Sequence, residues 1–255
     1  MSSPRWPFLD WPHPIPFAHR GGGAERPENT MVAFEAAVRL GYRYLETDVR
    51  ATSDGVLVAF HDHQLDRVAD RPGVIAELTY AELSSARVEG EPIPRLDELL
   101  AAWPEARWNI DAKHDAAVSP LVSAIERAAA QDRVCIGSFS SKRADRLRRL
   151  TANLVCTWMG RAEIGRLRLA SLGLPVPAFA AACAQVPPRV GPGYGAPLTD
   201  QRFVDTAHSR GLAVHVWTIN DLSEMRRFLD LGADGVFSDR PSLLKQVLVE
   251  RAQWS

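Results

Sequence analysis

Short apolar runs alternate along the chain with longer segments in which apolar residues recur at helical spacing. The short runs are rich in Val, Ile and aromatic residues or are bounded by Gly, Pro and Asp, which is typical of strands. An alternation of strands and helices over the whole chain predicts a mostly parallel sheet covered by helices. The predicted strands are 15–19, 44–50, 56–60, 107–111, 134–138, 154–157, 179–185, 213–217 and 234–238.

The intervening segments carry the start and stop signals of helices. In residues 30–40 the apolar positions share one face, and Gly41 follows as a typical C-terminal residue. Asp221 and Glu224 form a capping pair before a later helix, and Pro241 occupies the position of a first-turn proline. These signals place helices between successive strands.

One pair of strands departs from the parallel pattern. Only about five residues separate 44–50 from 56–60, whereas a parallel crossover needs about a dozen. Ser53-Asp54-Gly55 is a turn sequence, so these strands are predicted to form an antiparallel hairpin. A turn centred on residues 53 and 54 places His61 opposite Glu46.

With the hairpin arm set aside, eight parallel strands remain, the number that closes a (β/α)8 TIM-type barrel. The alternative is an open, doubly wound sheet, whose first and last strands do not meet. Residues 64–95 have little strand character and contain Pro92 and Pro94 near their end. We interpret them as a small cap over the barrel mouth, within a single domain covering residues 1–255.

Composition narrows the class of protein. The chain has 255 residues, 46% of them hydrophobic, and a formal charge of −1, which argues against a disordered chain and against a nucleic-acid-binding surface. No apolar stretch reaches the length of a transmembrane segment, and residues 1–10 lack the apolar core of a signal peptide. Three cysteines, Cys135, Cys156 and Cys183, are expected to be buried and reduced, as in a cytoplasmic protein. They have no zinc-site spacing, which disfavours zinc.

Catalytic residues in a barrel gather at the carboxyl ends of the strands. The first strand ends in His19-Arg20-Gly21-Gly22-Gly23, and the helix beginning at residues 27–30 offers a partly positive N-terminus suited to an anion. At the end of a later strand, Trp217 is either a core residue or the floor of a substrate pocket. We expect Asp239 to have a structural role and His215 to make at most a minor contact.

Acidic side chains recur on one side of two strands. Glu46 and Asp48 are two positions apart in one strand, and Asp111 and Lys113 are two positions apart in the next parallel strand. Ion pairs with cationic side chains would explain them, but three carboxylates at one rim favour a hard divalent cation, Mg²⁺ or Ca²⁺. Lys113 would then face an anionic substrate, and His61 would stand beside the metal.

The ordered set of motifs resembles the glycerophosphodiester phosphodiesterase family. The resemblance extends from the first strand to residue 241. Asp111 stands where the family usually has Glu, and Arg26 stands where a small residue is common, which leaves the choice of metal more open than the reaction. The matching segments are His19-Arg20-Gly21, Pro27-Glu28-Asn29-Thr30, Glu46-Thr47-Asp48-Val49, Ser53-Asp54-Gly55, His61-Asp62, Asn109-Ile110-Asp111-Ala112-Lys113, Trp217-Thr218-Ile219-Asn220 and Asp234-Gly235 through Asp239-Arg240-Pro241.

The resemblance implies a barrel enzyme of lipid metabolism that uses a divalent metal to hydrolyse glycerophosphodiesters to glycerol 3-phosphate and an alcohol. It implies that His19 and His61 are the acid–base pair and that Arg20 contacts the phosphate. It also implies the metal ligands Glu46, Asp48 and Asp111. The nucleophile is either the glycerol hydroxyl or water, and either histidine could act first as the base. No residue in the sequence is diagnostic of the alcohol head group or of the oligomeric state.

Two other functions remain open from the sequence. A lysophospholipase D-like enzyme would use the same residues and would need an apolar surface for an acyl chain. The aromatic cluster Trp6, Phe8 and Trp11 could supply that surface or could instead seal one end of the barrel. A non-catalytic anion-binding barrel would have lost a histidine or a metal carboxylate, and all of these are present here.

Overall fold

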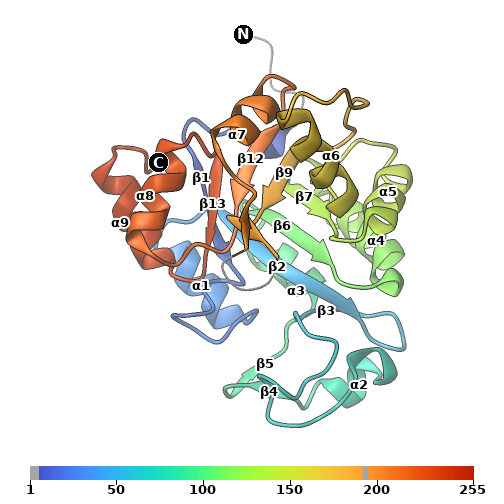
Figure 1. The fold of residues 1–255 in the computed structure, drawn as a ribbon. Helices are drawn as coiled ribbons and strands as arrows, with labels where there is room; N and C mark the ends of the chain where they lie inside the picture. The colour runs from blue at the N-terminus through green and yellow to red at the C-terminus, as the bar shows by residue number, and fades with distance from the viewer. Residues whose placement is uncertain (1–5, 192–194) are drawn as a thin grey trace.

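A ring of parallel strands surrounded by helices forms the body of the molecule (Figure 1). The computed structural model describes residues 6–191 and 195–255. The parallel strands follow the order β8-β7-β6-β2-β1-β13-β12-β9, and β3 pairs with the outer part of β2. Their bounds are β1 Ile15–His19, β2 Tyr44–Ala51, β3 Leu57–Ala59, β6 Arg107–Ala112, β7 Val134–Gly137, β8 Cys156–Thr157, β9 Cys183–Val186, β12 Ala213–Val216 and β13 Gly235–Ser238.

The two ends of this strand order meet. Trp158, just after β8, forms a parallel bridge with Cys183 in β9. The amide of Met159 donates to the carbonyl of Cys183 at 3.0 Å, and the amide of Ala182 donates to the carbonyl of Thr157 at 2.8 Å. The ring is therefore closed, which confirms the predicted (β/α)8 barrel and rules out the open sheet.

Helices cover the outside of the barrel because their apolar faces pack on the outward side chains of the strands. Side-chain caps mark several starts: Thr30 accepts from the amide of Ala33, and Asp221 accepts from the amides of Ser223 and Glu224. The α-helices are α1 Met31–Arg39, α2 Tyr80–Leu83, α3 Leu96–Ala102, α4 Val118–Arg127, α5 Ser141–Leu150, α6 Arg161–Ser171, α7 Gln201–His208, α8 Leu222–Asp230 and α9 Pro241–Glu250. The 3-10 turns are η1 Pro7–Leu9, η2 Ile75–Glu77, η3 Asp115–Ala117 and η4 Gln131–Arg133.

The predicted β2–β3 hairpin is present, but its register differs by one residue from the expectation. Val49 pairs with Ala59, so residue numbers in pairs sum to 108, and His61 falls opposite Thr47 instead of Glu46. The loop holds three residues, with the amide of Thr52 donating to the carbonyl of Val56 at 2.9 Å. Gly55 adopts a φ of 84°, as three-residue hairpin loops require.

Residues 64–95 form a small layer beside β3 (Figure 1). The layer contains η2, α2 and a two-stranded hairpin, β4 Arg87–Val88 with β5 Glu91–Pro92. Its apolar side chains, among them Leu65, Ile75 and Leu83, pack on Val58 in β3 and on Phe60 just after it. The single-domain organisation and the role of this layer as a cap stay predictions.

Aromatic residues fill the amino end of the barrel. Phe8 packs edge-on against Tyr44, with ring centroids 5.2 Å apart, and Trp11 does so at 5.3 Å. Phe17 also contacts Tyr44, the first residue of β2. The N-terminal aromatic cluster therefore seals this end, which leaves the carboxyl ends of the strands for chemistry. In the described ranges, no helix is long and apolar enough to span a bilayer.

Candidate active site

A hollow at the carboxyl ends of the strands brings together all eight residues predicted for the site. It measures about 530 Å³ including its open mouth. Strands β1, β2 and β6, with the residues just after them, supply most of its polar side chains. His61, two residues after β3, reaches it from the hairpin. The predicted residues that line it are His19, Arg20, Glu46, Asp48, His61, Asp111, Lys113 and Trp217.

A tight turn after β1 directs the first motif into this hollow. The amide of Gly22 donates to the carbonyl of His19 at 2.9 Å. Gly21 has a φ of 79°, and a Cβ there would lie 2.8–2.9 Å from atoms of Ala33 in α1, so only glycine allows the turn to approach the helix. The turn points the amide of Arg20 at Glu46 Oε2, 3.0 Å away.

His19 is held by the carboxylate of Asp239, a residue for which the sequence predicts a structural role. Its Nδ1 lies 2.5 Å from Asp239 Oδ1, and its Nε2 lies 3.7 Å from Glu46 Oε2. Asn220 Nδ2 donates to the other oxygen of Asp239 at 2.8 Å. Burial lowers the pKa of His19, but Glu46 and Asp239 outweigh it, and the net shift is upward. Asp239 therefore belongs to the site as the partner that orients His19.

His61 has an equivalent partner next to it in the chain. Its Nδ1 lies 2.6 Å from Asp62 Oδ1, and burial lowers its pKa. Arg67 connects this pair to the β1 turn, because it donates to Asp62 and also to Glu28 at 2.6 and 3.0 Å. Glu28 in turn accepts from Arg20 at 3.1 Å.

The three carboxylates differ sharply in their electrostatic surroundings. Burial, together with the charge of Asp48, raises the pKa of Glu46 to about 7. Asp48 is equally buried, but Lys113 Nζ lies 2.8 Å and Arg20 Nε 3.1 Å from its oxygens, and these cations hold its pKa well below the ordinary value. Burial raises the pKa of Asp111, although Lys113 Nζ is only 2.7 Å away.

The donor set fits a hard cation in its chemistry. Three carboxylates face one hollow, and Asp111 Oδ1 is buried with no hydrogen-bond partner, so it is a ligand oxygen without a donor. In this structure the ammonium of Lys113 lies between Asp48 and Asp111. Among the described residues, the oxygen atoms of these three carboxylates do not all lie within 4.8 Å of one another.

The segment 27–30 does not take the part expected of it. Thr30 caps α1, but within the described ranges this helix start does not line the hollow. Asn29 acts instead from behind the carboxylates. Its side chain donates to Asp48 Oδ2 at 3.3 Å and accepts from Thr47 Oγ1 at 2.8 Å. The motif therefore fixes the position of Asp48.

Several residues that line the hollow, among them Asn109, Phe139 and Gln185, were not predicted for the site from the sequence, whereas Trp217 was. Asn109 and Gln185 hydrogen-bond to each other through both pairs of amide atoms, at 2.7 and 3.3 Å. Phe139 packs edge-on against Trp217 at 5.3 Å, so the wall is aromatic. His215 is fully buried, in the barrel interior near Gln185. The alternation of residues along β9 could have shown that Gln185 points inward.

Comparison with known proteins agrees with this arrangement. Residues 19–243 match the model of the glycerophosphoryl diester phosphodiesterase family. The chain is 39% identical, over 99% of its length and 97% of the relative's, to the Mycobacterium tuberculosis protein named "Probable glycerophosphodiester phosphodiesterase 2". It is 28% identical, over 91% of its length and 85% of the relative's, to a Rattus norvegicus protein named lysophospholipase D GDPD1.

Solved structures share the fold. An Oleispira antarctica phosphodiesterase in complex with the product sn-glycerol-3-phosphate superposes with a TM-score of 0.78 at 24% identity, covering 93% of this chain and 97% of that one. A glycerophosphodiester phosphodiesterase from Agrobacterium tumefaciens gives 0.77 at 22% identity, covering 92% and 99%. The family match spans most of the chain and includes every residue that lines the hollow, so the chain belongs to the glycerophosphoryl diester phosphodiesterase family.

Proposed function

We propose that this phosphodiesterase cleaves glycerophosphodiesters with two histidines that act on opposite sides of one phosphate, assisted by a divalent metal ion. The observation that carries the proposal is that both imidazoles make the same kind of hydrogen bond. The Nδ1 atoms of His19 and His61 are each engaged by a carboxylate, from Asp239 and Asp62 respectively. That contact fixes each ring and leaves its Nε2 available for proton transfer.

The cationic side chains in the hollow suit a phosphodiester. Arg20 and Lys113 both line it, and both contact the buried carboxylate of Asp48. The phosphate oxygens can accept from donor positions that remain on both groups, because a guanidinium has five N–H donors and an ammonium three. These two residues would bind the anionic phosphate and stabilise the charge that develops on it.

Glu46, Asp48 and Asp111 are the residues that would hold the metal ion, and their oxygen atoms suit Mg²⁺ or Ca²⁺. A bound ion of this kind supplies positive charge that polarises the phosphate oxygens. It would also give the unpartnered Oδ1 of Asp111 a ligand contact. Asn29 and the backbone amide of Arg20 would keep Asp48 and Glu46 in place.

Proton movement follows from the position of the histidines. One imidazole takes the proton of the attacking hydroxyl, as a new bond forms to phosphorus. The other gives a proton to the oxygen of the leaving alcohol, as its bond to phosphorus breaks. The attacking group is either water or the neighbouring glycerol hydroxyl, in which case a water then opens the cyclic ester. Both routes sum to diester plus water giving glycerol 3-phosphate and the alcohol.

The deciding experiment measures release of the alcohol, choline or ethanolamine, from glycerophosphocholine, glycerophosphoethanolamine and lysophosphatidylcholine. The other product is glycerol 3-phosphate from the first two substrates and lysophosphatidic acid from the third. Chelator-treated protein should be inactive and should regain turnover with Mg²⁺ or Ca²⁺. We expect the glycerophosphodiesters to be preferred, because the N-terminal aromatic cluster lies at the far end of the barrel from the hollow. Full activity in protein shown to be free of divalent metal would refute the proposed metal dependence. A preference for lysophosphatidylcholine would favour lysophospholipase D activity instead.

A further inference from the structure

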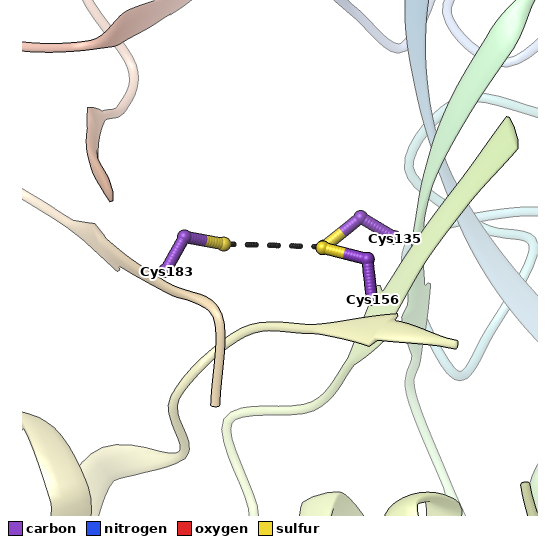
Figure 2. A group of neighbouring side chains, drawn as sticks. All are labelled: Cys135, Cys156 and Cys183. Carbon is purple, nitrogen blue, oxygen red and sulfur yellow. Dashed lines mark hydrogen bonds between the residues drawn. The ribbon is translucent and has the colours of Figure 1, made fainter. Parts of the chain in front are cut away.

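Three cysteines that lie far apart in the sequence meet inside the barrel (Figure 2). Cys135 lies on β7, Cys156 on β8 and Cys183 on β9, and closure of the ring makes these strands neighbours. The Sγ atom of Cys135 is 3.4 Å from that of Cys156 and 3.9 Å from that of Cys183. All three thiols are free and buried.

The spacing of these sulfur atoms is that of thiolates sharing one metal ion. Zn–S bonds of about 2.3 Å at tetrahedral angles place sulfur atoms about 3.8 Å apart. A disulfide would need about 2.05 Å, which no pair approaches here. In the described part of the chain, this is the one group of three acidic, histidine or cysteine side chains whose ligand atoms all lie within 4.8 Å of one another.

A histidine beside the cysteines provides a second, independent observation. His215 is fully buried, and its Nε2 has no hydrogen-bond partner. The ring interacts with the thiol of Cys183, and its Nδ1 lies 3.5 Å from Gln185 Nε2. Buried imidazole nitrogens are rarely left without a partner, and three cysteines with one histidine are a known structural zinc set.

We propose that the barrel interior is a binding site for a soft divalent ion, with Zn²⁺ held by the thiolates of Cys135, Cys156 and Cys183. The ring of His215 contacts Cys183 but lies outside the group of ligand atoms within 4.8 Å of one another, so it would move closer to the ion to become the fourth ligand. Three S–H bonds break as three Zn–S bonds form, and the three protons pass to bulk water. The resulting cluster has a net charge of −1, whereas a monovalent ion would leave −2. Burial among apolar side chains favours the smaller charge.

This sulfur site is distinct from the carboxylate site above it. The mutual hydrogen bonds of Asn109 and Gln185 form the floor of the hollow, and Gln185 Nε2 lies 4.0 Å from Cys183 Sγ on the other side. Hard cations prefer the carboxylates and soft ions prefer the thiolates. Because the thiols are buried, we expect the ion to enter during folding and to contribute to stability.

The test is metal content and a cobalt spectrum. The full chain is refolded with Zn²⁺ or Co²⁺ and passed over a chelating resin. We expect one zinc ion per chain, and in the cobalt protein the visible bands and thiolate charge-transfer absorption of tetrahedral sulfur ligation. Cys156→Ser and Cys183→Ser should lower retained metal by at least about tenfold, because loss of even an outer-shell partner of a metal site costs that much. Asp111→Asn, in the carboxylate site, should keep the cobalt–thiolate spectrum.

A further measurement on the unaltered chain keeps the test decisive if a cysteine variant does not fold. Zinc uptake during refolding should release three protons per chain and should protect all three thiols from alkylation. The proposal fails if the refolded wild-type chain retains no zinc, or if the cysteine variants retain as much as wild type. It also fails if Cys135 and Cys156 form a disulfide in the presence of zinc.

Discussion

His19 Nδ1 and Asp239 Oδ1 lie 2.5 Å apart, although 220 positions separate the two residues in the sequence. The contact joins the end of the first barrel strand to the residue just after the last one, strands that are neighbours because the ring is closed. Asn220 holds the other oxygen of Asp239. The ring orientation of His19 therefore depends on closure of the barrel as well as on its own strand.

Asp239→Asn should lower kcat by about 10- to 100-fold, less than the roughly 10²- to 10⁴-fold loss expected on removal of a general acid or base. The carboxylate raises the pKa of His19 through its hydrogen bond and its charge, so the limb of the pH–rate profile that reports His19 should move to lower pH. Asp234→Asn is the matched control, since Asp234 pairs with His208 at 2.8 Å on the exposed surface. If the pH–rate profile of Asp239→Asn is the same as that of wild type, Asp239 has only a structural role.

His61→Ala should lower kcat by about 10²- to 10⁴-fold, because in the proposed mechanism it removes one of two proton-transfer groups. His63→Ala is the control, since His63 is two residues away and exposed and does not line the hollow, as far as the described residues define it. Turnover of both variants on glycerophosphocholine, with circular dichroism to verify folding, is the measurement. Equal activity of the two variants would exclude His61 from the mechanism.

Arg67→Ala should lower kcat several-fold with little loss of stability. Its guanidinium is about half exposed, and ion pairs of that kind contribute about 0–1 kcal/mol to the free energy of unfolding. Its removal frees both Glu28 and Asp62, so the positions of Arg20 and His61 become less defined. Arg71→Ala is the control, because Arg71 donates to Glu82 and Ser85 within the 64–95 layer. Wild-type kcat in Arg67→Ala would show that these contacts do not support catalysis.

Glu46→Gln should stabilise the metal-free protein at pH 8 while abolishing activity. Burial raises the pKa of Glu46 from 4.5 to about 7, so this carboxyl favours the folded state below about pH 4.5 and loses that contribution as pH rises to about 7. The gain at pH 8 should be about 1–3 kcal/mol, measured by urea unfolding in chelator.

Added Mg²⁺ or Ca²⁺ should make wild type the more stable of the two proteins, because only wild type keeps all three proposed carboxylate ligands. Glu35→Gln, on the exposed face of α1, should behave as wild type throughout. A metal-free Glu46→Gln that is less stable than wild type at pH 8 would show that the carboxylate is well solvated or paired in solution.

The barrel and the eight residues predicted for its hollow could be inferred from the sequence because both depend on local patterns. Alternation along each strand shows which side chains point inward, and the position of a residue at the end of a strand places it at the mouth. Glu46, Asp48 and Asp111 come together for these reasons alone. The hairpin register differs by one residue because a turn sequence is compatible with both two- and three-residue loops. The backbone pairing and the positive φ of Gly55 distinguish them.

Contacts between distant segments could not be predicted in the same way. Asp239 reaches His19, and Arg67 reaches Glu28, only through the closed ring and the packing of the 64–95 layer. The three cysteines illustrate the limit most clearly, because their spacing in the sequence resembles no metal motif. They meet only because β7, β8 and β9 lie side by side.

The seam between β8 and β9 gives the two sides of the barrel unequal rigidity. β8 has two residues, and a single bridge with a few flanking hydrogen bonds joins it to β9, whereas β2 pairs with β6 over six residues. Local opening costs least where the fewest backbone bonds must break. Water would therefore reach the interior first through this seam. Local opening there would leave the wall that bears the carboxylates intact.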